Sequence, residues 1–410
     1  MKIKITMFLL LIIHFAFAQP KAKEQLTPDF EKLPQLLWKF NTGSPVIGSP
    51  VIDERCVFIG SINGTLYALD KNTSTVVWKF ETGGAIRSAV CLNQDKLFLI
   101  SGDGNLYCLN KTSGKMLWYF KTTTGFIGDV QHDFADYYQS SPVIYNNIIY
   151  FGSGDGNVYA VNSADGEMNW KFETSGAVHT TPAFYKDKLF IGSMDGNLYA
   201  LNAITGMLIW KFKSTGHQYF PRGEMMGNPV TAKGLVFAGS RDYNFYAIDI
   251  NGGYCRWMKQ FPKGWALPVT VNDSVIYLGT SDDRQLFALD IKTGTVKWKA
   301  GAGFNIFGGC ALGITTGYFG TLMGKVFAID LKTGATRWTF TTDGYNKNHL
   351  NYFKPDDSYR DDIGTIIGSS ENIVSLYNNM GAIFSTPAIS GNLMVISSTD
   401  GNVYCLKKVD

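Results

Sequence analysis

The chain has 410 residues, of which 45% are hydrophobic and 17% charged, and its formal net charge is +3. Without Lys2 and Lys4, which lie in a segment expected to be removed, the formal charge falls to +1. This near-neutral balance excludes a whole-molecule field that would attract nucleic acid or an anionic membrane. Any charge-dependent recognition must therefore come from a local group of residues.

Residues 1–18 have the pattern of a signal peptide. Two lysines precede an apolar run over residues 7–13, and residues 16–18 (Ala-Phe-Ala) form a small-x-small cleavage site. The run is too short to span a membrane, so we expect an exported protein, periplasmic or secreted. Residues 19–34 are a polar leader that we expect to be loose. No Cys lies near the cleavage site, so we expect no membrane anchor.

One hairpin unit recurs along the rest of the chain. It reads GSMDGNLYALNAITGMLIW from Gly192 to Trp210, and similar copies run from Gly60 to Trp78 and from Gly152 to Trp170. A Gly-containing turn precedes an alternating strand, and a second turn leads to a strand that contains a Trp. An aromatic residue marks the alternating strand eight times: Tyr67, Tyr107, Tyr159, Tyr199, Tyr246, Phe287, Phe327 and Tyr404. Eight Trp residues, which we call the register Trp residues, mark the second strand: Trp38, Trp78, Trp118, Trp170, Trp210, Trp257, Trp298 and Trp338.

The two series are out of phase, which predicts a closed ring. Trp38 has no strand motif before it, and Tyr404 has no Trp after it. We therefore expect the strand Gln35–Asn41 to pair with the strand from Asn402 to Leu406, which would leave no exposed sheet edge between the first and last repeats. Repeats of about 40 residues with four short strands are typical of β-propellers. The fold predicted for residues 35–410 is all-β, a single eight-bladed β-propeller of four-stranded antiparallel blades.

At these residues the chain resembles the quinoprotein-type (PQQ-like) propeller family, whose docking motif is Ala-x-Asp-x-x-x-Gly-x-x-x-Trp. Two repeats match it fully: Ala288, Asp290, Gly294 and Trp298; Ala328, Asp330, Gly334 and Trp338. Asn162 or Asn202 replaces the Asp elsewhere, and Ser74 replaces one Gly. The resemblance implies that the Trp packs between blades. The scaffold serves both quinone enzymes and non-enzymatic assembly factors, and in size and blade number the chain resembles the BamB-type assembly lipoproteins.

Three connections between blades are longer than the others. The basic distance from a register Trp to the Pro of the next inner strand is 12 residues, whereas Trp118 to Pro142 is 24, Trp210 to Pro229 is 19 and Trp338 to Pro387 is 49. In a propeller these crossings lie on one face, around the mouth of the central channel. Loops on a rigid scaffold often carry function, although surface decoration is the alternative.

The four histidines outside residues 1–18 all lie in these crossings. They are His132, His179, His217 and His349. Their shared location favours a functional mouth, although His is common in loops. No pair has helical metal-binding spacing, so a divalent cation would have to be held by separate loops.

One position in each crossing is predicted to face the channel. Around the ring these positions read Ile47, Arg87, Gln139, His179, Met226, Trp265, Phe307 and Phe384. Three consecutive polar side chains thus face an arc of bulky apolar ones. An acidic sugar would suit this ring, because CH faces stack on aromatic rings and a guanidinium binds a carboxylate. The alternative is that Trp265, Phe307 and Phe384 merely fill the channel.

The largest crossing contains an enlarged loop, residues 341–383, that is long enough to form a lid over the mouth. Its tyrosines and His349 could complete a site. The acidic cluster Asp356, Asp357, Asp361 and Asp362 lacks the spacing of an EF-hand loop. A solvated acidic loop is the expected structure there.

From these features we expect a lyase that eliminates across a uronate in an acidic oligosaccharide or polysaccharide. Arg87 and Gln139 would neutralise the carboxylate, His179 would be the base, and Tyr138 or Tyr219 would be the acid. The remaining candidates are His132, His217 and His349 for catalysis and Arg222 for ligand binding. We expect a monomer that binds no nucleic acid.

Two alternatives stay open. The first is a non-enzymatic BamB-type scaffold, whose partners would be outer-membrane proteins. The second is a quinoprotein dehydrogenase, but the chain is shorter than those enzymes and has no adjacent Cys pair of the kind that forms their quinone-stacking disulfide. We therefore expect no cofactor, and in particular no PQQ. A divalent cation held by the crossings is the alternative.

Overall fold

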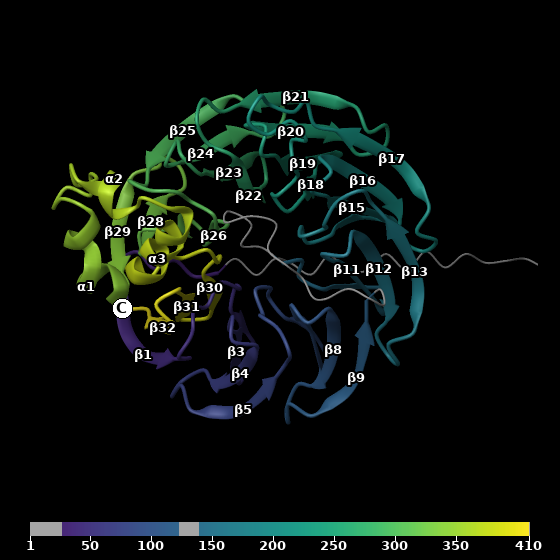
Figure 1. Ribbon diagram of the computed structural model, residues 1–410, viewed down its shortest axis with the longest axis horizontal. Helices are drawn as coiled ribbons and strands as arrows, with labels where there is room; N and C mark the ends of the chain where they lie inside the picture. Colours follow the sequence, from purple (N-terminus) through teal and green to yellow (C-terminus); the bar gives the residue numbers. More distant parts are fainter. Residues whose placement is uncertain (1–26, 123–138, 410) are drawn as a thin grey trace, which may run out of the picture.

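The computed structural model describes residues 27–122 and 139–409. Within these ranges the strands form eight four-stranded antiparallel sheets, arranged around a ring as the blades of a propeller (Figure 1). The predicted all-β, eight-bladed fold is therefore confirmed. No helix of the described part is long and apolar enough to cross a membrane.

The blades follow one another along the chain, and each runs from an inner strand to an outer strand. Blades 1 to 4 comprise β2 (Val51–Ile52), β3 (Cys56–Gly60), β4 (Thr65–Asp70) and β5 (Val76–Glu81); β6 (Cys91–Asn93), β7 (Lys96–Ile100), β8 (Asn105–Asn110) and β9 (Met116–Lys121); β10 (Val143–Tyr145), β11 (Ile148–Gly152), β12 (Asn157–Asn162) and β13 (Met168–Glu173); β14 (Ala183–Tyr185), β15 (Lys188–Gly192), β16 (Asn197–Asn202) and β17 (Leu208–Lys213). Blades 5 to 8 comprise β18 (Val230–Ala232), β19 (Leu235–Gly239), β20 (Asn244–Asp249) and β21 (Cys255–Gln260); β22 (Ala266–Asn272), β23 (Val275–Thr280), β24 (Gln285–Asp290) and β25 (Val296–Gly301); β26 (Ala311–Leu312), β27 (Thr316–Gly320), β28 (Lys325–Asp330) and β29 (Thr336–Thr341); β30 (Ala388–Ser390), β31 (Leu393–Ser397), β32 (Asn402–Lys407) and β1 (Gln35–Asn41).

The first strand completes the last blade, as predicted. β1 pairs antiparallel with β32, from Gln35 opposite Lys407 to Asn41 opposite Asn402. The two strands lie side by side in Figure 1, where the purple start of the described chain meets its yellow end. The ring is therefore closed by hydrogen bonds between segments that are far apart in the sequence.

The register Trp residues join each blade to the next. Trp298, for example, donates a hydrogen bond from Nε1 to the carbonyl of Leu331 in the following blade, at 3.1 Å. Gly334 lies against the same ring with φ +76°, and a Cβ at this position would come within 2.6 Å of the indole. The Gly of the repeat is thus required both by the backbone conformation and by the close approach of the Trp.

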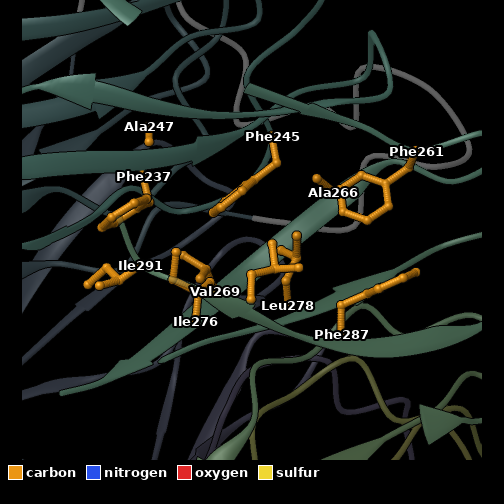
Figure 2. Packing of buried hydrophobic residues seen from close by; sticks show 11 residues of the cluster. Phe237, Phe245, Ala247, Phe261, Ala266, Val269, Ile276, Leu278, Phe287 and Ile291 are labelled. Atoms are coloured by element: carbon orange, nitrogen blue, oxygen red, sulfur yellow. The ribbon is translucent and has the colours of Figure 1, made fainter. Parts of the chain in front are cut away.

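Hydrophobic side chains of neighbouring blades interdigitate between the sheets. Figure 2 shows one such interface, where Phe237 and Phe245 of blade 5 face Ile276 and Leu278 of blade 6. All four side chains are fully buried. Burial of each contributes about 1.5–3 kcal/mol, so the interfaces between blades supply much of the stability of the ring.

The described part of the polar leader is not loose. Asp29 accepts hydrogen bonds from the backbone of Thr315 and Thr316, and Phe30 is fully buried against blade 7. The carbonyl of Phe30 also accepts the Nε1 hydrogen bond of Trp338, at 2.6 Å. The other register Trp residues use a carbonyl near the turn between the two outer strands of the next blade. In blade 8 these strands, β32 and β1, are not joined by a turn. The carbonyl of Phe30 accepts the hydrogen bond of Trp338 instead.

The enlarged crossing between β29 and β30 contains three helices. They are α1 (Asp343–Tyr352), α2 (Ile363–Ile366) and α3 (Ser370–Met380), and Figure 1 shows them together on one side of the ring, at blades 7 and 8. Thr342 caps α1 by accepting a hydrogen bond from the backbone of Tyr345, and Gly381 ends α3 in the left-handed conformation. We call residues 342–381 the helical insertion.

Candidate functional site

Five of the eight residues predicted to face the channel line a small cavity on the propeller axis. Ile47, Arg87, Gln139, Phe307 and Phe384 line this axial cavity, whose volume is about 80 Å³. Ligand pockets commonly measure roughly 300–1,000 Å³. The rings of Phe307 and Phe384 pack edge to face with centroids 5.7 Å apart. Phe307 and Phe384 therefore occupy part of the channel, and the cavity that remains there is too small for a sugar.

The polar arc of the ring has a structural task. The Oε1 of Gln139 accepts a hydrogen bond from the backbone of Arg87, and Ser141 accepts one from the backbone of Ala89. Thr181 in turn accepts one from the backbone of Ser141. These side chains satisfy backbone N–H groups of the neighbouring blade, where the inner strands of different blades do not pair. His179 and Met226, at the next two ring positions, are both 4% exposed.

Among the described residues, His217, Tyr219 and His349 do not line the axial cavity with Arg87 and Gln139. His217 lies in the crossing between blades 4 and 5, where its ring packs against Tyr243 with centroids 4.7 Å apart. Tyr219 is 71% exposed, and the side chain of Arg222 is also exposed. His132 and Tyr138 lie outside the described residues.

His349 belongs to a charged cluster that anchors the helical insertion to blade 7. Its Nε2 lies 2.8 Å from Oδ1 of Asp357, although no hydrogen bond is aligned between them. Asp357 also pairs with Lys325 of β28 and accepts a hydrogen bond from Tyr345, at 2.8 Å. Burial alone would raise the pKa of Asp357, but the bonds from Lys325 and Tyr345 hold it below its usual value. His349 is therefore placed to support the fold of the insertion.

The remaining carboxylates of the acidic cluster are engaged by nearby groups. Asp361 pairs with Lys354, Asp362 pairs with Arg360, and Asp356 accepts hydrogen bonds from Ser358. Across residues 27–122 and 139–409, no three His, Cys, Asp or Glu side chains lie close enough together to hold a metal ion.

A larger pocket lies off the axis, between the mouth of blades 4 to 7 and the helical insertion. Its volume is about 410 Å³, within the range of ligand pockets. Aromatic side chains from the crossings, from one hairpin turn and from the insertion form most of its walls: Phe220, Tyr243, Trp265, Phe304, Tyr359 and Tyr377. We call this cavity the aromatic pocket. Of the predicted ligand-binding residues, Trp265 and Phe307 line it, and Phe307 and Phe384 line the axial cavity.

Two arginines stack on the walls of the aromatic pocket. The guanidinium carbon of Arg241 lies 4.5 Å from the ring centroid of Trp265 and 4.8 Å from that of Phe220. The guanidinium of Arg284 lies 5.3 Å from Phe304 and 5.1 Å from Tyr359. These cation–π contacts fix the rings in place. Sequence reasoning missed both arginines because they lie in hairpin turns, outside the crossings.

One corner of the aromatic pocket is polar. Asp282 is exposed, and its carboxylate accepts hydrogen bonds from Ser281 Oγ at 3.2 Å and from Asn305 Nδ2 at 3.3 Å. Burial raises the pKa of Tyr243, and the nearby charge of Asp282 raises it further. Burial also raises the pKa of Tyr359. Both phenols therefore stay protonated at neutral pH and can donate hydrogen bonds.

Comparison with solved structures shows the fold again. The chain is 14% identical to BamB from Moraxella catarrhalis, with a TM-score of 0.68 over 92% of this chain and all of that one. It is 13% identical to the quinohemoprotein alcohol dehydrogenase of Comamonas testosteroni, with a TM-score of 0.67 over 93% of this chain and 78% of the enzyme. The computationally designed protein Ika8 gives a TM-score of 0.68 at 15% identity, over 92% of this chain and 99% of the design.

Comparison with protein families gives a more specific result. No curated protein matches the chain. The family described as outer membrane protein assembly factor BamB matches residues 34–135, 63–300 and 195–351, which together cover most of the propeller. The resemblance seen in the docking motifs is thereby confirmed, and the chain belongs to this PQQ-like family of BamB-type propellers.

Proposed function

We propose that the protein is a non-enzymatic scaffold that binds outer-membrane proteins during their assembly. The observation that carries this proposal is the match to the BamB family, which extends from residue 34 to residue 351. This proposal takes the scaffold alternative in preference to the uronate lyase. Export directed by residues 1–18 would deliver the protein to the compartment where such partners fold.

The positions of the candidate catalytic residues support a scaffold rather than a lyase. Elimination needs a base, an acid and a group that neutralises the carboxylate, all within hydrogen-bond reach of one substrate. Here Gln139 binds the backbone of Arg87, and His349 supports the helical insertion. Arg87 and Gln139 line the axial cavity, whose volume of about 80 Å³ leaves no room for the substrate.

The residues at the axis also do not fit the quinone that the fold family implies. PQQ is a flat molecule of three fused rings with three carboxylates, so its site must be wide and cationic. The axial cavity instead contains the packed rings of Phe307 and Phe384, and Arg87 is the one cationic side chain among its described lining residues. No step of a dehydrogenase reaction can be assigned to this cavity.

Exposed apolar side chains on the mouth face offer contacts for a partner. Tyr219, in the crossing between blades 4 and 5, is 71% exposed, and Leu350 of α1 is 62% exposed. A few large side chains of this kind contribute much of the binding energy in protein interfaces. Closure of the ring and packing of the axis make the surface that carries them rigid, which reduces the entropy lost on binding.

The test is deletion of the gene in the organism that encodes it, followed by quantitative mass spectrometry of isolated outer membranes. We expect outer-membrane proteins to decrease, while soluble exported proteins stay unchanged. Wild type and Ile204→Ala should restore them, because Ile204 is also exposed, at 65%, but lies in the turn between β16 and β17 at the opposite face. The double variant Tyr219→Ala/Leu350→Ala should restore them only in part.

Two results would overturn the proposal. One is an unchanged outer-membrane protein profile after deletion. The other is formation of an unsaturated product, detected by ultraviolet absorbance, when the purified protein is incubated with uronate oligosaccharides.

A further inference from the structure

The aromatic pocket has a recognition chemistry that the proposed scaffold function does not use. We infer that it is a binding site for a neutral saccharide, with a pair of vicinal hydroxyl groups on Asp282 and an apolar ring face on the aromatic walls. This inference goes beyond the proposed function and concerns different residues from Tyr219 and Leu350.

The polar corner presents an oriented acceptor. Ser281 donates to one oxygen of the Asp282 carboxylate and Asn305 donates to the other, which fixes the plane of the group. Ser281 Oγ is itself fixed, because it accepts a hydrogen bond from the backbone of Trp265 at 2.9 Å. Asp282 has no ion-pair partner in the described part of the chain. A carboxylate held in this way has free lone pairs on both oxygens and suits a ligand with two adjacent donors.

Two ligand classes offer paired donors: cations such as ammonium or guanidinium groups, and vicinal diols. The two stacked arginines disfavour the cation. Arg241 and Arg284 already hold positive charges 4.5–5.3 Å from the ring centroids of Trp265, Phe220, Phe304 and Tyr359. A third cation among the same rings would be repelled by both, and it would compete for ring surfaces that are already polarised.

A vicinal diol on a sugar ring is neutral, so it can donate hydrogen bonds to Asp282 without being repelled by the two arginines. The hydroxyls of a pyranose donate to the carboxylate, while the CH groups on one side of the ring bury apolar surface against the aromatic walls. The phenols of Tyr243 and Tyr359 supply donors for the ring oxygen or a further hydroxyl, because burial keeps both protonated. A volume of about 410 Å³ leaves room for a small saccharide.

The test is calorimetric titration of the purified full-length protein with cellotetraose, mannotetraose, maltotetraose and chitotetraose. We expect at least one of them to bind with Kd below about 10 mM. Asp282→Asn removes the charged acceptor but keeps the shape, so the Kd of that saccharide should rise about ten-fold to a hundred-fold. Asp361→Asn is the matched control, because Asp361 is an exposed carboxylate outside the pocket, 92% exposed at its side chain, and the Kd should not change.

Choline and a Phe-containing tripeptide are the competing probes, for a caged cation and for a polypeptide side chain. Tighter binding of either probe than of every saccharide would overturn the inference. The absence of saccharide binding would also overturn it, as would an unchanged Kd in Asp282→Asn. The outer-membrane profile of the deletion strain tests the scaffold proposal separately, so the two proposals can fail independently.

Discussion

Individual polar residues explain why the docking motif tolerates exchange between Asp and Asn. Oδ1 of Asp70 accepts hydrogen bonds from the backbone of Asn72 and Thr73, and Oδ1 of Asn202 accepts the equivalent bonds from Ile204 and Thr205. One carbonyl-type oxygen is sufficient for this turn, so the departures from the family motif leave the blade geometry unchanged.

Asp330 makes a further contact, because its second oxygen binds Arg337 of β29. Arg337 donates to Oδ2 at 2.7 Å, and this bond is the main reason that the pKa of Asp330 falls to about 2. Since the folded pKa is depressed, the stabilisation is present above pH about 4 and is lost as the pH falls toward 2. We expect Asp330→Asn to lower stability at pH 7 by no more than about 0.5 kcal/mol, given solvent screening, and by much less at pH 2, where the carboxyl is about half protonated in the folded protein.

Thermal unfolding of both proteins at pH 7, 4 and 2 measures this difference. Arg337→Gln should remove the same pH-dependent difference, because it deletes the other partner. A gap between Asp330→Asn and wild type that stays constant down to pH 2 would contradict the assignment.

Phe30 is the second residue with a specific prediction. Its side chain is fully buried against blade 7, while its backbone binds Tyr318 and Trp338. Phe30→Ala should lower the free energy of unfolding by about 3–5 kcal/mol, because a large aromatic side chain leaves a cavity. Leu33→Ala, at a side chain that is 50% exposed, should change it by less than about 0.5 kcal/mol. Equal melting temperatures for the two variants would show that the leader contributes nothing to blade 7.

At the scale of elements, the helical insertion was only partly predictable from the sequence. Its position, length and location over the mouth follow from the distance between Trp338 and Pro387. Its helices do not, because α1 buries only Gly344 and His349 and so lacks a continuous apolar stripe. The insertion is held to the ring instead by a small apolar cluster, which includes Phe353 and Leu376, and by the ion pair of Asp357 with Lys325.

Asp357→Asn should therefore loosen the insertion without unfolding the ring. The substitution leaves the partly buried ammonium of Lys325 without its carboxylate, at a cost of about 1–3 kcal/mol that is confined to this contact. We expect faster cleavage within residues 342–381 in limited proteolysis, with little change in the melting temperature of the propeller. Lys354→Gln breaks the exposed pair with Asp361 and should leave the cleavage rate as in wild type. Equal cleavage rates in all three proteins would refute the anchoring role.

The candidate site was less predictable than the fold, for a physical reason. Repeats fix the blades, because an aromatic residue and a register Trp recur at matching positions in the copies of the unit. Five of the eight positions predicted at the axis line the cavity there, but sequence could not show that Phe307 and Phe384 would pack together in the channel. The aromatic pocket depends on where the crossings, the hairpin turns and the insertion meet. The position of this pocket could not be predicted from Trp265 alone.

At the scale of the whole molecule, stability depends on closure of the ring by β1. Trp38 is 8% exposed, packs among buried residues of blades 1 and 8, and donates a hydrogen bond to the carbonyl of Lys71 at 2.8 Å. β1 also covers the edge of β32 over the register from Gln35 to Asn41. Removing this strand exposes a long sheet edge and one face of blade 1, so it should affect every blade through its neighbours.

We therefore expect a chain that begins at residue 42 to melt at least about 10 °C lower than wild type and to aggregate, since the lost strand and the buried Trp are worth several kcal/mol. A chain that begins at residue 31 is the control, because it lacks Phe30 but keeps β1, and the difference between the two isolates closure from leader packing. Differential scanning fluorimetry and light scattering after size-exclusion chromatography provide the two measurements. A synthetic peptide of residues 27–41 should restore part of the lost melting temperature by pairing with β32. The chain that begins at residue 42 could instead be monomeric and have the same melting temperature as the control. In that case the ring is stable without β1, and closure by this strand is not what stabilises it.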